Sequence, residues 1–200
     1  MPARRSSRPV PPVTQALIVA NVIVFLAQNS SGLPLVEWFA LWPDENFELW
    51  QLITYSFLHG SVAHIFFNMF GLYMFGSDVE RLFGSRFYLW YYAVSAVVAG
   101  ACHLIVTTAM GTPPAPMVGA SGGIYGLLLA FGWYFPQRRV VLLFPPIPMS
   151  ARTFVIVFAA IELFLGVTGT AAGVAHFAHL GGMLGGWLMI EYRRRYSRRR

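Results

Sequence analysis

Six stretches of mostly apolar residues follow one another along the chain, separated by shorter polar segments. Each is close to the length of about 20 residues that an α-helix needs to cross the hydrocarbon core of a bilayer. The stretches cover residues 13–29, 61–78, 87–107, 119–135, 152–168 and 174–192. This pattern predicts an all-α fold, a polytopic bundle of six transmembrane helices.

The composition favours the same class. Of the 200 residues, 56% are hydrophobic and 11% are charged, whereas a soluble domain has about 25% charged residues. The one cysteine, Cys102, excludes an internal disulfide, and no C-x-x-C or H-E-x-x-H pattern indicates a zinc site. The net charge of +6 comes from arginines clustered between apolar stretches, so it favours a lipid bilayer rather than nucleic acid as the partner.

The arginines predict the orientation of the bundle. They lie at positions 4, 5 and 8, at 81 and 86, at 138, 139 and 152, and at 193–195 and 198–200. With six spans, all fourteen fall on one side, and the connections 30–60, 108–118 and 169–173 contain none. The positive-inside rule then predicts cytoplasmic termini. We expect an integral membrane protein of a bacterial cytoplasmic (inner) membrane.

The same pattern suggests three segments. Residues 1–12 form a short basic cytoplasmic N-terminus, 13–192 the six-span domain, and 193–200 a basic cytoplasmic tail. The first stretch could also be a signal peptide, but Asn21, Gln28 and the lack of a small-residue cleavage site favour a retained span. The external connection 30–60 is predicted to be an amphipathic insert in the outer interface, with an ordinary loop as the alternative.

Four polar side chains from three spans are predicted to share one depth. Counting about 1.5 Å of rise per residue from the cytoplasmic ends places Ser121 about 22 Å, His179 about 20 Å, His64 about 24 Å and Asn68 about 18 Å into the membrane. The core is about 30 Å thick, so all four lie below the outer surface. Polar groups at such depth are costly and indicate a functional site.

Ser121 and His179 are the candidate reacting pair. Ser121 opens the fourth span, where free N–H groups could hold an oxyanion, although a lone serine at this place could also be a packing contact. A serine hydroxyl needs a base to become a nucleophile. His179 lies at the matching depth, and glycines in both spans would let the helices approach closely; His176, about one turn shallower, is the rival.

Neighbouring side chains extend this hypothesis. His64 and Asn68 are four residues apart on one helix face and could donate to an oxyanion. Tyr125 lies one turn after Ser121 and could pack on the ring of His179. Glu162 is placed about one helical turn below the reacting pair, so it is expected to bond a neighbouring helix instead. The sequence therefore predicts a Ser–His dyad without a carboxylate.

Three motifs resemble those of the rhomboid family of intramembrane serine proteases. Gly119-Ala120-Ser121-Gly122 is similar to its nucleophile motif, Ala178-His179-Leu180-Gly181-Gly182 with Gly186 to its sixth-span histidine motif, and His64-Ile65-Phe66-Phe67-Asn68 to its H-x-x-x-N oxyanion motif. The motifs occur in the family's order, and the resemblance extends from the first span to the last. One departure is Trp50-Gln51, where many members have Trp-Arg.

The resemblance implies roles for these residues. Ser121 would be the nucleophile, His179 the general base, and His64, Asn68 and the Ser121 N–H the oxyanion donors, while Tyr125 would stack on the histidine. Gly119, Gly122, Gly182 and Gly186 would support the site. No metal or cofactor is implied. The substrates would be transmembrane segments of membrane proteins, cut near the outer face, and either the fifth span or the first loop would gate their entry.

Two other functions remain open at this point. An inactive relative would bind membrane clients without cutting them, but such relatives usually lose the serine or the histidine. A small transporter would also use glycine-rich helices and buried polar groups. It needs a polar path across the membrane, and the cytoplasmic halves of these spans carry few ionisable groups apart from Glu162.

Overall fold

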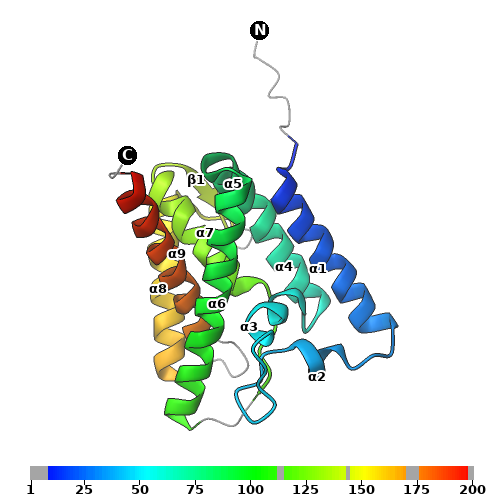
Figure 1. Cartoon of the computed structure of the whole chain (residues 1–200). Coiled ribbons are helices and arrows are strands. Elements are labelled where there is room, and N and C mark those ends of the chain that lie inside the picture. Colours follow the sequence, from blue (N-terminus) through cyan, green and yellow to red (C-terminus); the bar gives the residue numbers. More distant parts are fainter. Residues whose placement is uncertain (1–8, 112–114, 143–144, 170–175, 198–200) are drawn as a thin grey trace.

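The computed structural model describes residues 9–111, 115–142, 145–169 and 176–197 and has an all-α architecture (Figure 1). The α-helices are α1 (Pro12–Ser30), α2 (Leu35–Phe39), α3 (Gln51–Thr54), α4 (Val62–Gly71), α5 (Ser77–Phe83), α6 (Ser85–Met110), α7 (Ser121–Tyr134), α8 (Ala151–Thr168) and α9 (His176–Ser197). A 3-10 turn, η1 (Tyr55–Phe57), follows α3, and a π-helical turn, η2 (Leu72–Gly76), joins α4 to α5.

Helices occupy all six predicted spans. By length and apolarity, α1, α6 and α8 could each cross a membrane. The second predicted span is divided into α4, η2 and α5, and the fourth is α7, which has 14 residues. At about 1.5 Å per residue α7 is about 21 Å long, so Ser121 at its beginning lies inside the bundle.

A small hairpin in the fourth connection departs from the predicted pattern. Strands β1 (Arg139–Val141) and β2 (Pro148–Ser150) pair antiparallel, with Val140 opposite Met149. They lie in the connection between α7 and α8. Three-residue strands leave too short an alternation to be read from the sequence.

The centre of the bundle is formed by α6, α7 and α9, which pack on one another. Glycines set the spacing of α7 and α9. A Cβ on Gly182 would collide with the carbonyl oxygen of Gly122, and one on Gly186 would lie 3.1 Å from the Cα of Gly126. The predicted close approach of two small-residue faces is therefore present.

A buried carboxylate ties α1 to the rest of the bundle. Glu80 on α5 is 2% exposed and accepts hydrogen bonds from the backbone N–H groups of Val13 and Thr14 (3.0 and 2.7 Å). The hydroxyls of Thr14 and Ser85 also donate to it, at 2.8 and 2.6 Å. Since the beginning of a helix leaves its N–H groups unpaired, Glu80 serves as the missing acceptor for α1.

The connection between α1 and α4 is anchored by its backbone and by Gln51. Leu41 and Met117 exchange two backbone hydrogen bonds of 3.0 and 2.9 Å. The buried Gln51 side chain accepts from the Trp42 N–H and donates to the Asn46 carbonyl. Gln51, the departure noted above, thus fastens this connection. Its predicted insertion into the interface stays a prediction.

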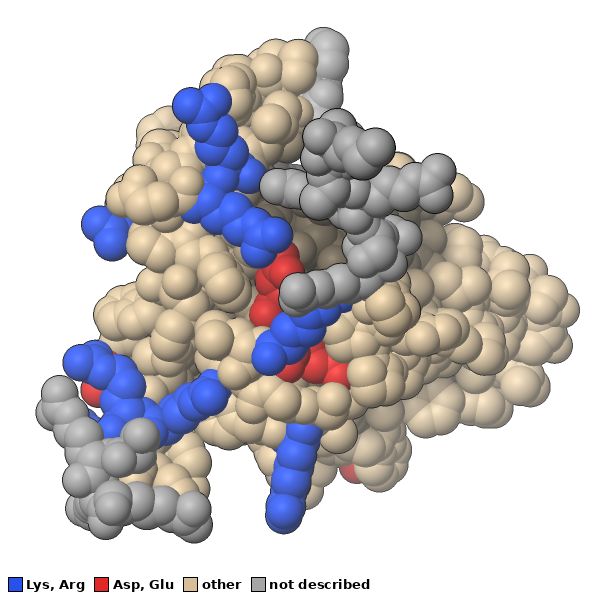
Figure 2. All heavy atoms as spheres, turned by 90° about the horizontal axis from the view of Figure 1, so that it is seen from above, with Lys and Arg blue, Asp and Glu red and all other residues tan. Residues whose placement is uncertain are grey.

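Both described ends of the chain lie on one face, where α1 begins and α9 ends (Figure 1). Seen from above, this face carries a group of arginine side chains with a few acidic ones between them (Figure 2). This agrees with the one-sided distribution of arginine in the sequence. Residues 1–8 and 198–200 of the two predicted basic segments lie outside the described residues.

Candidate active site

Ser121 is held at the N-terminus of α7 by an unusual backbone. Gly119 has φ of 125°, a conformation that favours glycine, and its N–H donates to the Tyr55 carbonyl at 3.0 Å. A Cβ at Gly119 would lie 2.7 Å from Nε2 of His64. Glycine is therefore required here for two reasons: the backbone conformation favours it, and a side chain would collide with the ring of His64. The first N–H groups of α7, including that of Ser121, have no partner within the helix.

The structure brings His179, and not His176, to the serine. Nε2 of His179 lies 2.9 Å from Oγ of Ser121, the distance of a hydrogen bond. The contact joins α7 to α9 at the level of the Gly122–Gly182 approach. His176, one turn earlier on α9, instead places its Nδ1 2.7 Å from Oε2 of Glu162.

Tyr125 packs on His179 as the sequence suggested. The two rings are stacked, with centroids 4.2 Å apart and an interplanar angle of 5°. The phenol also donates a hydrogen bond to Oε1 of Glu162. Tyr125 therefore limits the ring of His179 on one face and connects it to α8.

The expectation that Glu162 lies out of reach is wrong. Its Oε2 is 3.0 Å from Nδ1 of His179, although the N–H is not aligned on that oxygen as a hydrogen bond would require. The depth count assumed that Arg152 and Tyr192 mark one level. In fact α9 continues past Tyr192 to Ser197, whereas Arg152 lies at the beginning of α8. The two residues therefore do not mark the same depth in the membrane. The sequence contained one signal for this contact. Glu162 is the one acidic residue of α8, and the next helix, α9, carries both His176 and His179.

These three residues are also close enough to be tested as a metal site. One ligand atom from each of Glu162, His176 and His179 lies within 4.8 Å of the others. However, the carboxylate already receives the Tyr125 hydroxyl and faces two imidazole nitrogens. Its lone pairs are thus used by donors, and the arrangement fits a hydrogen-bonded carboxylate better than a metal cage.

His64 and Asn68 face the serine from α4. Both line one cavity together with Ser121 and His179. Nδ2 of Asn68 donates to the His64 carbonyl at 2.9 Å, which leaves its second N–H available. Nδ1 of His64 accepts from the Gly60 N–H at 3.4 Å. That bond favours a proton on Nε2, the nitrogen beside Gly119.

His59 lies behind His64 in the segment before α4. It is fully buried, and the two rings meet edge to face with centroids 5.0 Å apart. Burial, reinforced by the neighbouring His64, lowers the pKa of His59 to about 4. His59 is therefore neutral, and it supports the His64 ring without adding charge to the site.

The cavity at the serine has a volume of about 630 Å³ and extends between α4 and α8. Apart from the polar groups at Ser121, its lining is apolar and aromatic: Phe67, Phe70, Met74, Phe75, Ile124, Leu128, Phe154 and Phe158 contribute to it. It continues to Val140 and Val141 of the hairpin. An apolar chain approaching from the lipid could therefore reach the serine from the side.

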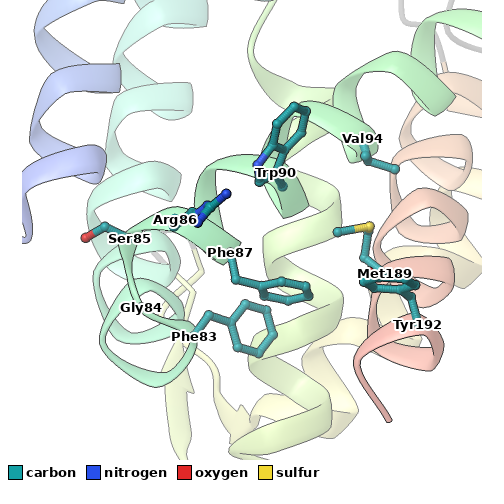
Figure 3. Close-up of a pocket in the computed structure, with 9 residues that line it drawn as sticks. All are labelled: Phe83, Gly84, Ser85, Arg86, Phe87, Trp90, Val94, Met189 and Tyr192. Carbon is teal, nitrogen blue, oxygen red and sulfur yellow. The ribbon is translucent and has the colours of Figure 1, made fainter. Parts of the chain in front are cut away.

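A second cavity, of about 760 Å³ (Figure 3), shares no lining residue with the first. It is formed by the beginning of α6 and the last turns of α9, with Phe87 and Trp90 on one side and Met189 and Tyr192 on the other. Apart from the tyrosine, Ser85 is the one hydroxyl-bearing residue in its described lining, and that hydroxyl donates a hydrogen bond to Glu80. The lining that the structure describes for this cavity contains no histidine that could pair with Ser85.

Comparison with known proteins decides the family. Residues 46–196 match the model of the rhomboid domain. The chain belongs to the rhomboid family. This stretch contains all three motifs noted in the sequence, and the all-α membrane bundle is the rhomboid-like fold.

Individual rhomboid relatives are similar at moderate identity. Rhomboid protease GluP of Bacillus subtilis (strain 168) is 30% identical over 167 residues, which cover 84% of this chain and 28% of that protein. Rhomboid protease GlpG of Salmonella choleraesuis (strain SC-B67) is 26% identical over 89% of this chain and 62% of its own length. The mitochondrial presenilin-associated rhomboid-like protein A of Danio rerio is 31% identical, over 88% and 46%. This rhomboid chain thus spans less than two thirds of each.

Proposed function

We propose that this rhomboid protein is an intramembrane serine endopeptidase that cuts transmembrane segments of membrane proteins near the outer face. The proposal treats residues 13–192 as the protease domain and both termini as cytoplasmic, in a bacterial inner membrane. The observation that carries it is the contact of Ser121 Oγ with His179 Nε2 at 2.9 Å, at the end of an apolar cavity between α4 and α8.

In the proposed reaction His179 takes the proton of the Ser121 hydroxyl as the oxygen attacks a peptide carbonyl. The negative charge on the carbonyl oxygen is held by the Ser121 N–H, Asn68 and His64. His179 then protonates the leaving amine, and the acyl-enzyme is hydrolysed by water that His179 activates in turn.

The depth of the site explains the choice of substrate. A peptide carbonyl in a helix is bonded and shielded, and unpaired backbone groups are expensive in lipid. A substrate segment must therefore unwind where polar groups can receive it. The layer formed by Ser121, His179, His64 and Asn68 offers such a place next to the apolar cavity.

The test is cleavage of a model transmembrane substrate by the purified protein in proteoliposomes, combined with fluorophosphonate labelling. We expect both signals in the wild type and neither in Ser121→Ala. His179→Ala should lower both by at least about 10³-fold. Cleavage that survives Ser121→Ala would overturn the proposal. A wild type that binds the substrate but neither cuts it nor labels would favour the inactive, client-binding relative.

A further inference from the structure

Glu162 is a buried carboxylate whose partners are the side chains of the candidate active site. It is 7% exposed, and in the described part of the chain its partners are Tyr125, His176 and His179. We propose that Glu162 is a positioning residue that sets the tautomer and orientation of His179, turning the dyad into a Ser121–His179–Glu162 chain. This inference rests on the proposed function of Ser121 and His179.

The cost of the carboxylate supports a role of this kind. A charge inside a bilayer is unfavourable by several kcal/mol unless it is paired. Glu162 makes no ion pair with an arginine of the described residues; the ion pairs of Glu162 are with His176 and His179. A carboxylate meant only to join helices would be satisfied by hydroxyl and amide donors. Here two of its three partners, His176 and His179, are imidazoles that can gain a proton.

The geometry matches what a general base requires. Nε2 of His179 can accept the serine proton only if the ring carries its other proton on Nδ1. The carboxylate of Glu162 lies 3.0 Å from that Nδ1 and therefore favours this tautomer. When Nε2 takes the proton from Ser121, the new imidazolium lies beside the carboxylate and is stabilised by it. The proton stays on His179 until it passes to the leaving amine.

Tyr125 completes the positioning. Its hydroxyl donates to Oε1 of Glu162 while its ring stacks at 4.2 Å on His179, so one residue fixes both partners. The Nδ1–H of His179 is not yet aligned on Oε2 in this state. Hydrogen bonds of a catalytic chain commonly tighten when the substrate binds, and a small rotation of the ring is enough.

Two substitutions separate orientation from charge. Glu162→Gln can keep a carbonyl oxygen toward His179 but loses the charge, whereas Glu162→Met loses both. We expect kcat to fall about 10-fold in Glu162→Gln and about 10²-fold or more in Glu162→Met, with KM changed by less than about 2-fold. Ile161→Ala, the neighbouring lipid-facing position at 45% exposure, is the matched control and should keep wild-type kcat.

A spectroscopic measurement tests the same inference without catalysis. In protein labelled with ¹⁵N-histidine, the wild-type His179 signal should be that of the Nδ1-protonated tautomer. The signal is assigned by its loss in His179→Ala. In Glu162→Met we expect a mixture of tautomers. Glu162→Gln is measured beside it, because its side chain has nearly the same shape as that of glutamate and the variant should fold as the wild type does.

The outcomes separate the two proposals. A folded Glu162→Met with kcat within about 3-fold of wild type, or with an unchanged His179 tautomer, overturns the positioning role and leaves the Ser121–His179 assignment standing. A wild type that neither cuts nor labels overturns the proposed function, and the tautomer measurement still decides whether Glu162 controls His179.

Discussion

Glu80 on α5 and Glu162 on α8 are both buried carboxylates, 2% and 7% exposed. Glu80 is bound by two backbone N–H groups and two hydroxyls, none of which changes its charge near neutral pH. Glu162 faces two imidazoles and a phenol. The first set of donors suits a permanent joint between helices, whereas the two imidazoles of the second set can gain or lose a proton while the carboxylate stays in place.

The unpartnered atoms of the two regions differ in the same way. All four donors at Glu80 lie within 3.0 Å of its oxygens. Around Glu162, the buried Nε2 of His176 and Nδ1 of His179 lack a hydrogen-bond partner. Buried unsatisfied groups are costly and tend to persist where they serve a reaction. The comparison therefore separates the structural carboxylate Glu80 from Glu162, whose functional role is proposed above, by the kind of donor and not by burial.

The largest effect on folding is expected from Glu80→Gln. An amide offers one acceptor oxygen and turns an NH₂ toward donors, so at least one N–H of α1 loses its partner. We expect the free energy of unfolding in detergent to fall by about 2–4 kcal/mol, while cleavage per folded molecule stays within about 2-fold of wild type.

Glu191→Gln is the control for that experiment. Glu191 lies in the same end of the bundle and forms an exposed ion pair with Arg194 at 2.6 Å, so its loss should change stability by less than about 1 kcal/mol. If Glu80→Gln instead lost activity and kept its stability, the division between the two carboxylates would not hold.

Much of this arrangement could be predicted from the sequence because lipid imposes simple rules. A span must be apolar and long enough, which located six helical spans, and a regular rise placed Ser121, His179, His64 and Asn68 in one layer. The glycines at 122 and 182 signalled the close approach that the Ser–His contact needs.

The two carboxylates show where such reasoning ends. Depth along one helix does not fix the height of its neighbour, so Glu162 was placed a turn away from His179 although the two are in contact. Three of the four donors to Glu80 belong to Val13 and Thr14 at the beginning of α1, 67 and 66 positions away, and no side-chain motif reports them. Contacts that depend on the relative height and tilt of helices need the structure.

A smaller effect, on activity, is expected from Tyr125→Phe. The substitution keeps the ring stacked on His179 and removes only the hydrogen bond to Glu162, so kcat should fall about 3- to 10-fold, the equivalent of about 1 kcal/mol. Initial rates on the transmembrane substrate measure it. Tyr73→Phe, at an exposed position on η2, should leave kcat unchanged. A loss as large as that of Glu162→Met would mean that the phenol, and not the carboxylate, controls the histidine.

The smallest effect is expected from Thr14→Val, which keeps the shape of the side chain and removes its hydroxyl. That hydroxyl donates to Glu80 at 2.8 Å and lies 3.1 Å from the Tyr88 hydroxyl, while the Thr14 N–H still binds the carboxylate. We expect a loss of about 1 kcal/mol in thermal or denaturant unfolding and no change in kcat. Thr14→Ser, which keeps the hydroxyl, should lose less. A larger loss in Thr14→Ser than in Thr14→Val would assign the effect to packing of the methyl group and not to the hydroxyl. A change in kcat would mean that the hydrogen bonds of Glu80 and the Ser121–His179 pair are coupled through α1 and α4.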